Sequence, residues 1–176
     1  MKPLLYGLSL VILMLSHGAL AAENQMEAGA AIAWSAEGRV FRTTPDQIEF
    51  QGALEGIMYI ESSSGALDEA FVECSFKQVV KDGSETTHGS GNCMIIQSAD
   101  DSAFAEFDCN GVIGACRGEF RLTAGTGRLK GIKGSSPLIM RSPLRHMLDG
   151  ISNGSVIGVD SGIALLLDLK YTLGGK

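Results

Sequence analysis

Few residues in this chain have the types and spacing that enzyme chemistry requires. Gly150, Ser152 and Gly154 match the Gly-x-Ser-x-Gly pattern around a serine nucleophile. In that motif the serine follows a strand and precedes a helix, and an acid and then a histidine come later in the chain. His88 and His146 both precede Ser152, and strand-like sequence follows it. We therefore interpret Ser152 as part of a polar loop.

Other motif-like patterns also lack the context that their chemistry needs. Residues 159–162 imitate an aspartic protease signature, but only 14 residues follow them, too few to complete a lobe. The glycines of residues 125–131 differ from a dinucleotide-binding loop, because the third glycine comes one position late. The histidines and carboxylates show none of the usual metal-ligand spacings. The sequence thus predicts no metal, no cofactor and no identifiable catalytic residue.

Four cysteines provide the clearest chemistry in the chain. The N-terminus has the pattern of a secretory signal, and an even number of cysteines in an exported protein favours disulfides. Turn-like residues at 82–85, 99–102 and 111–114 lie midway between successive cysteines. If these are three successive hairpins, the cysteines face one another in a single row across four antiparallel strands. The four residues are Cys74, Cys93, Cys109 and Cys116.

Strand spacing then selects one pairing of these cysteines. Neighbouring strands lie about 4.8 Å apart, so a cysteine two strands away is about 9.6 Å distant. A disulfide needs Cα atoms within about 7 Å. On this condition only Cys74 with Cys93 and Cys109 with Cys116 make two bonds. We predict this pairing.

The N-terminus and the composition indicate an exported single domain. Lys2, an apolar run over residues 4–15 and small residues before Ala22 fit a signal peptide over residues 1–21. That run is shorter than the roughly 20 residues that span a bilayer, so we expect no membrane span and release into the periplasm or the medium. Residues 22–176 suffice for one domain. The net charge of −6, without a basic cluster, argues against a nucleic-acid partner.

The elements that must position these residues are mainly strands. Apolar and polar residues alternate over 72–77, 105–109, 116–122 and 165–173, and each cysteine shares the apolar face of its strand. Shorter strands are expected at 39–43, 47–51 and 56–61, separated by Pro45 with Asp46 and by Gly52. A single helix is expected at Ser142–Gly150, with Ser142 as N-cap, and residues 149–162 read as a loop. Many short strands and little helix predict a sandwich or a barrel.

The segment Gly118–Gly134, with the sequence GEFRLTAGTGRLKGIKG, resembles the family that contains allene oxide cyclases and dirigent proteins. Members carry an apolar strand, a glycine-rich turn with threonine or serine, and a spaced glycine before the next strand. The matching turn residues here are Gly125, Thr126, Gly127, Gly131 and Gly134. The resemblance implies an all-β fold with a single eight-stranded antiparallel barrel, stapled here by disulfides. In that barrel Gly125 and Gly127 would give a tight hairpin positive φ, and Gly131 and Gly134 would allow a bend.

This barrel suggests two functions. The first is an exported, non-enzymatic protein that binds a small lipophilic molecule or a partner protein. The alternative is a cofactor-free isomerase or cyclase resembling allene oxide cyclase, which steers its substrate by shape. Glu49, Tyr59 and Glu61 are candidate ligand residues if they point inward. The resemblance also leaves a homo-oligomer open, because barrels of this superfamily often associate. An open cavity with a polar group at depth would favour the enzyme, and a filled barrel an interaction or structural role.

Overall fold

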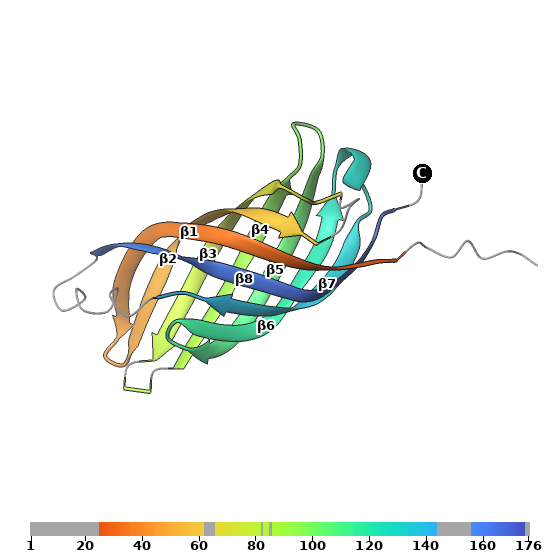
Figure 1. Cartoon of the computed structure of the whole chain (residues 1–176). Helices are drawn as coiled ribbons and strands as arrows, with labels where there is room; N and C mark the ends of the chain where they lie inside the picture. The colour runs from red at the N-terminus through yellow and green to blue at the C-terminus, as the bar shows by residue number, and fades with distance from the viewer. Residues whose placement is uncertain (1–24, 62–65, 82, 85, 144–155, 175–176) are drawn as a thin grey trace, which may run out of the picture.

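The computed structural model describes residues 25–61, 66–81, 83–84, 86–143 and 156–174. They form a closed eight-stranded antiparallel barrel in which each strand pairs with the next along the chain and β8 pairs with β1 (Figure 1). This confirms the predicted fold class. The elements are β1 (Met26–Thr44), β2 (Gln47–Ile60), β3 (Ala70–Lys81), β4 (Thr86–Ile96), β5 (Ser102–Val112), β6 (Ala115–Gly125), a 3-10 turn (Gly127–Leu129), β7 (Lys133–Arg141) and β8 (Val156–Thr172).

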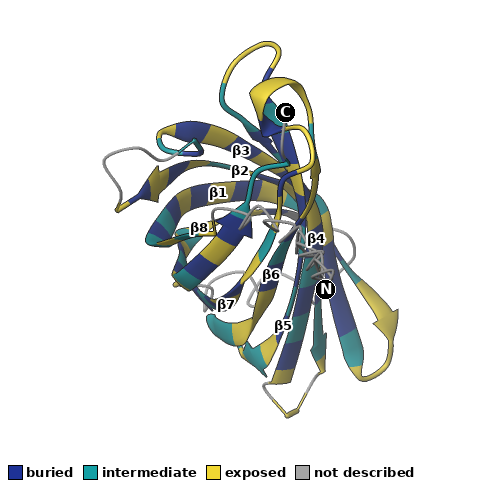
Figure 2. Ribbon diagram, turned by 90° about the vertical axis from the view of Figure 1, so that its right-hand side faces the viewer, coloured by how far each residue is buried: buried dark blue, intermediate teal, exposed yellow. Residues whose placement is uncertain are grey.

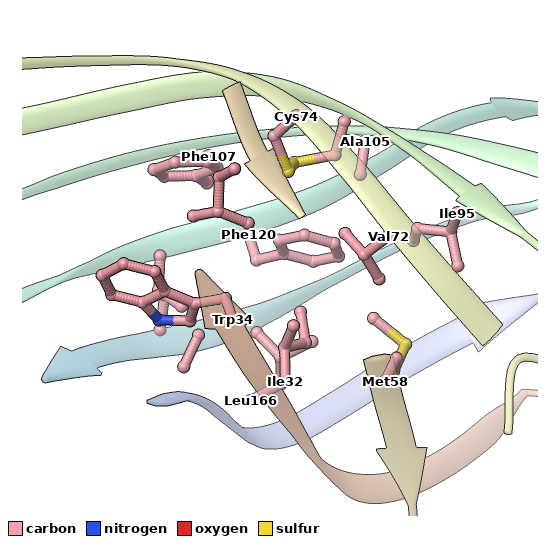
Figure 3. Packing of buried hydrophobic residues seen from close by; sticks show 14 of the residues in the cluster. Ile32, Trp34, Met58, Val72, Cys74, Ile95, Ala105, Phe107, Phe120 and Leu166 are labelled. Atoms are coloured by element: carbon pink, nitrogen blue, oxygen red, sulfur yellow. A yellow bond between two sulfur atoms is a disulfide. The ribbon is translucent and has the colours of Figure 1, made fainter. Parts of the chain in front are cut away.

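Alternation along the strands sends one face of each strand to the barrel interior. In β3, Val72, Cys74 and Phe76 are buried and the residues between them are exposed. Figure 2 shows this alternation as dark blue and yellow bands along the strands. The interior side chains meet in one core, in which the rings of Phe50 and Phe76 lie 5.6 Å apart and those of Phe76 and Phe107 lie 6.0 Å apart. Phe120 fills the middle of this core (Figure 3).

Three predicted boundaries are wrong. Gly52 does not separate two strands, because β2 runs through it. Gly38 of β1 is its register partner, and a Cβ on either glycine would lie 2.7 Å from the Cα of the other. The two glycines therefore let long strands approach closely where they bend. β1 also begins at Met26, well before the predicted strand at 39–43, and residues 156–162 belong to β8 rather than to a loop.

Part of the predicted helix lies outside the described residues. Ser142 and Pro143 are described and are not helical, whereas residues 144–150 are not described. Residues 149–155 of the predicted loop are also outside the described part, as is the predicted signal peptide.

A bulge in β8 changes which of its leucines face inward. The sequence places Leu165, Leu167 and Leu169 on one face, but Leu166 and Leu169 are fully buried and Leu167 is 55% exposed. The register of β8 shifts between Leu166 and Leu169 against β1, and between Leu166 and Lys170 against β7. The backbone N–H of Asp168 donates to Ser136 Oγ at 3.3 Å, so this N–H bonds to a side chain of β7. A bulge of this kind inverts the alternation that period-two reasoning assumes.

The predicted disulfides are confirmed, but the single row of cysteines is wrong. Cys74 and Cys93 are direct register partners with Cα atoms 4.0 Å apart. Cys109 is bonded to Cys116 across 5.6 Å, although its register partner is Gly118. The β5–β6 hairpin turns at Ile113 and Gly114, where Gly114 has a φ of 79°. The left-handed glycine sets the turn one residue later than expected, so this disulfide is diagonal.

Cys93 is likewise not opposite Cys109. Its partner on β5 is Ala105, because Ile96 lies opposite Ser102 and the β4–β5 connection is therefore centred on residue 99, two residues before the midpoint of Cys93 and Cys109. Gly89 is the residue opposite Cys109, and a Cβ there would lie 3.3 Å from the Cys109 sulfur. The cysteines thus occupy two inner rows, one for each disulfide.

Candidate functional site

The barrel interior is filled with side chains. One cavity of about 20 Å³ lies in the middle of the core and another of about 20 Å³ near the β5–β6 turn. Ligand pockets are typically about 300–1,000 Å³, so neither cavity holds a small lipophilic molecule. The central one lies among Trp34, Phe107 and Phe120, beside the Cys74–Cys93 disulfide (Figure 3). Interior ligand binding is therefore not supported by the side chains that surround these cavities.

A polar cluster lines the cavity near the β5–β6 turn. Asp160 of β8 is 8% exposed, and its neighbours include Trp34 of β1 and Ser142 at the end of β7. Gln78 Nε2 donates to Thr87 Oγ1 at 2.8 Å in the same cavity wall. Burial raises the pKa of Asp160, and the Ser161 N–H and the nearby Ser142 hydroxyl oppose that rise. The cluster has a polar group at depth, but the cavity around it has room for only about one water molecule.

The three candidate ligand residues do not gather in the interior. Tyr59 is 50% exposed, and its neighbours Met58 and Ile60 are the residues of β2 that face inward. Glu49 is buried on the outer side, where Lys77 Nζ lies 3.0 Å from its Oε2 and Gln51 donates to its Oε1. Glu61 follows the end of β2 and is exposed. The condition that they point inward is not met, although Tyr59 belongs to an outer groove described below.

The turn motif is part of a structured loop rather than a tight hairpin. Gly127 has a φ of 52° and Gly131 a φ of 79°, both left-handed. Gly125 has no positive φ, so its predicted role is wrong. The connection contains a 3-10 turn, and its left-handed residues, Gly127 and Gly131, come after Gly125 in the chain. Gly134 lies in β7, where a Cβ would come within 2.6 Å of the Tyr171 Cβ, so this glycine permits close approach of β7 and β8.

This loop is hydrogen-bonded to the β4–β5 connection at one end of the barrel. Asp101, in the β4–β5 connection, accepts hydrogen bonds from the backbone N–H and the Nε of Arg128, both at 2.7 Å. These two contacts hold the pKa of Asp101 below its ordinary value. Thr126 Oγ1 donates to the Asp100 carbonyl and accepts from the Ser102 N–H, each at 3.0 Å. Leu129 and Ile132 are buried beneath, so the motif has a structural role in this fold.

An apolar groove lies on the outer face of β8, β1, β2 and β3. It is shallow and open, with a volume of about 600 Å³. Its floor is made of small residues of β1, and its large apolar side chains stay partly exposed: Ile57 is 42%, Tyr59 50% and Phe71 41% exposed. We define the apolar groove by Ala33, Ser35, Glu55, Gly56, Ile57, Tyr59, Phe71, Ser161 and Gly162.

Strand register produces this groove. Ile163, Ala33, Ile57 and Phe71 are successive register partners across β8, β1, β2 and β3. Ile163 is 43% exposed, so large side chains flank the small Ala33 on both sides. Singly scattered exposed apolar residues are normal, whereas contiguous exposed apolar surface is typical of interaction sites.

Two acidic residues flank the apolar row. Glu55 of β2 and Glu73 of β3 are direct register partners, and both are exposed. Like charges directly opposite each other in a sheet are destabilising. Within the described ranges neither carboxylate has a hydrogen bond or ion pair that would offset this repulsion. The groove therefore presents unpaired negative charge beside exposed apolar surface.

A second outer groove, of about 640 Å³, differs in that its charges are paired. Lys77 and Glu49 form an ion pair along its wall at 3.0 Å. Arg121 contacts Glu106 at 3.0 Å and Glu119 at 2.6 Å, and these carboxylates raise its pKa. His88 also lies 3.3 Å from Asp108, with Asn110 on its other ring nitrogen at 3.1 Å. Both ring nitrogens of His88 therefore have partners on β5.

Sequence reasoning missed the apolar groove. The run Ile57–Ile60 is apolar at every position, and a continuous apolar run is typical of a strand buried on both sides. The pattern could have been read as an apolar outer face only with the strand register known. Tyr59 was singled out, but for an interior site.

The described residues include no group of three His, Cys, Asp or Glu placed to hold a metal ion. None of their helices has the length and apolar character needed to cross a membrane. The two disulfides fit an exported protein. No protein-family model, curated protein or solved structure matches the chain. The resemblance to the allene oxide cyclase and dirigent family therefore stays a prediction from the turn motif.

Proposed function

We propose that this protein is an exported, non-enzymatic binding protein that docks a partner protein on the apolar groove. The observation that carries the proposal is the contiguous exposed row of Ile163, Ile57 and Phe71 beside the unpaired acids Glu55 and Glu73. The filled interior supports the same conclusion, because the alternative role as an isomerase or cyclase needs a cavity for its substrate. The cavities of about 20 Å³ do not supply one.

The closed barrel restricts how a partner can bind. Each of the eight described strands has two neighbours, so this part of the chain offers no free edge for addition of an extended strand from a partner. Contact must instead be made through side chains on the outer face. Tyrosine is enriched among the residues that dominate binding energy, and Tyr59 stands half exposed in the groove.

Charge complementarity defines the chemistry of the partner. A segment that places apolar side chains over Ala33 and a lysine or arginine near Glu55 and Glu73 would bury the row and neutralise both acids. Opposite charges across an interface mainly raise specificity and the association rate. The occupant is therefore a protein segment that is both apolar and basic.

Selection of displayed random peptides with the wild-type protein tests this proposal. Enriched peptides are expected to combine apolar residues with lysine or arginine. Tyr59→Asp should weaken their binding by at least about tenfold, as expected for a central aromatic contact. Glu55→Gln with Glu73→Gln should weaken binding less and reduce its salt dependence. Val112→Asp is the matched control, because Val112 is an apolar residue 51% exposed outside the groove.

Three results would count against the proposal. Enriched peptides that are acidic would contradict the charge argument. Equal binding by the Tyr59→Asp and Val112→Asp proteins would place the site elsewhere. Sedimentation velocity that showed a dimer broken by Tyr59→Asp would identify a second copy of the chain, rather than a different protein, as the occupant.

A further inference from the structure

Three buried polar atoms line one cavity and have no partner at hydrogen-bond geometry among the described residues, although the Ser142 hydroxyl is near enough to Asp160 to oppose the rise in its pKa. They are Trp34 Nε1, Ser142 Oγ and Asp160 Oδ2. Trp34 is 6% and Asp160 8% exposed, so bulk water does not satisfy these two groups. Buried polar groups are nearly always hydrogen-bonded, so three together on one cavity require an explanation.

The barrel register brings these groups together. Asp160 pairs with Ala36, and Gly162 pairs with Trp34, so the carboxylate and the indole lie on the inner face of adjacent strands, two residues apart. Gly162 makes room for the indole, because a Cβ there would lie 2.7 Å from Trp34 Cζ2. Ser142 follows Arg141, the last residue of β7, whose register partner on β8 is Ile163. The three groups thus come from three neighbouring strands near the end where the β5–β6 hairpin turns.

The cavity is the size of one water molecule. Its volume is about 20 Å³, above the roughly 10–15 Å³ that a single water needs. Buried waters typically make about three hydrogen bonds to groups that would otherwise be unsatisfied. The cavity offers that number of unpartnered groups.

Hydrogen-bond chemistry defines the guest further. The indole N–H can only donate, and an ionised carboxylate can only accept. A guest that bridges them must therefore both accept and donate. Ammonium has no acceptor for the indole N–H, and an inorganic anion such as chloride has no donor and would be repelled by Asp160. Water satisfies both groups, and the Ser142 hydroxyl can serve it in either direction.

We propose that this cavity is a binding site for one resident water molecule, which accepts a hydrogen bond from Trp34 Nε1–H and donates one to Asp160 Oδ2. A third hydrogen bond joins it to Ser142 Oγ. The water connects β1, β8 and the end of β7 inside the barrel. This site lies inside the barrel, whereas the apolar groove lies on the outer face of the same strands.

NMR of the wild-type protein tests the site directly, because Trp34 is the single tryptophan and its indole N–H signal needs no assignment among several. A rotating-frame Overhauser cross-peak between this proton and long-lived water is expected, with the sign that distinguishes proximity from exchange. A crystal structure should place a water within hydrogen-bond distance of the three groups. An indole that donates directly to the carboxylate, or a dry cavity, would overturn the proposal.

Two variants and one salt comparison sharpen the test. Asp160→Leu fills the space with apolar atoms and removes the acceptor, so the cross-peak should disappear, whereas Asp160→Asn keeps an acceptor oxygen and should retain it. A cross-peak of equal intensity in the leucine variant would contradict the site. Exchange of sodium chloride for ammonium chloride at equal ionic strength should leave the indole signal unmoved. A saturable shift would show that the guest is ammonium. The wild-type measurements decide the matter even if the leucine variant does not fold.

Discussion

Removal of each disulfide should destabilise the barrel by a different amount. The Cys74–Cys93 bond joins residues 19 positions apart, and the Cys109–Cys116 bond joins residues 7 apart. In the chain-entropy model, loops of these lengths contribute about 3 and about 2.5 kcal/mol to the free energy of unfolding. Loop length alone therefore gives a small difference between the two bonds.

Packing enlarges that difference. Cys74 and Cys93 are 3% and 5% exposed and line the central cavity, so alanine at both positions enlarges an apolar void in the core. Void enlargement costs about 24 cal/mol per Å³, which adds roughly 1 kcal/mol for two sulfur atoms. In the second bond Cys109 is fully buried, but Cys116 is only partly buried, so only one of its two sulfur atoms leaves a void that cannot relax or hydrate. We expect a loss of about 4 kcal/mol for Cys74→Ala with Cys93→Ala and about 3 kcal/mol for Cys109→Ala with Cys116→Ala.

Urea unfolding without reductant, followed by the fluorescence of Trp34, measures both losses. The wild-type protein with both bonds reduced is the control, and it should lose more stability than either variant. The reasoning is refuted if the Cys109/Cys116 variant is as unstable as the Cys74/Cys93 variant, or more so. That result would mean that the second buried sulfur of the Cys74–Cys93 bond adds no stability beyond the loop term.

Three further predictions concern two buried acids and the loop that contains Gly127. Burial raises the pKa of Asp160, so the protonated carboxyl contributes its full stability below the ordinary pKa of 3.8, and this contribution is lost as pH rises through the folded-state pKa. Asp160→Asn should therefore raise the urea midpoint at pH 7 and flatten the dependence of that midpoint on pH. Hydrogen bonds from Arg128 lower the pKa of Asp101, so the ionised carboxylate stabilises the fold above pH 3.8, and this stability is lost as pH falls through the folded-state pKa. Asp101→Asn should therefore lower the urea midpoint at pH 7 and weaken the loss of stability in acid. Gly127→Ala should cost about 1–2 kcal/mol from its φ of 52° alone, and more because its Cβ would lie 2.2 Å from Asp101 Oδ1. Lys130→Ala, an exposed change in the same loop, should be nearly neutral in the same urea titration.

Alternation in the sequence was enough to predict which residues of β3, β5 and β6 face inward, but not the full extent of β1, β2 and β8. It was also enough for the disulfide pairing, because the distance between strands excludes the alternatives even when the register is misjudged. The register itself was not predictable to one residue. It depends on where a turn can adopt a left-handed conformation, and both Gly111 and Gly114 are available in the β5–β6 hairpin.

The bulge in β8 and the continuous β2 fall outside what period-two patterns describe. Leu165–Leu167 is a run of three identical residues, so composition gives no sign of which leucine leaves the inner face. Gly52 is a strand breaker by local propensity, and only its pairing with Gly38 makes it favourable in the strand. The apolar groove was hidden for a related reason, since it joins residues of four strands that only the three-dimensional register brings together.

The filled interior is itself encoded by glycines on inner strand positions. A Cβ at Gly91 would lie 2.5 Å from the ring of Phe107, and a Cβ at Gly89 would lie 3.3 Å from the Cys109 sulfur and 3.6 Å from the ring of Phe76. The space that these glycines leave is therefore occupied by aromatic rings and a disulfide rather than kept for a ligand. A barrel packed in this way can offer large exposed apolar side chains only on its outside. The position of Ile57, Tyr59 and Phe71 on that surface is why we place partner binding there rather than in the interior.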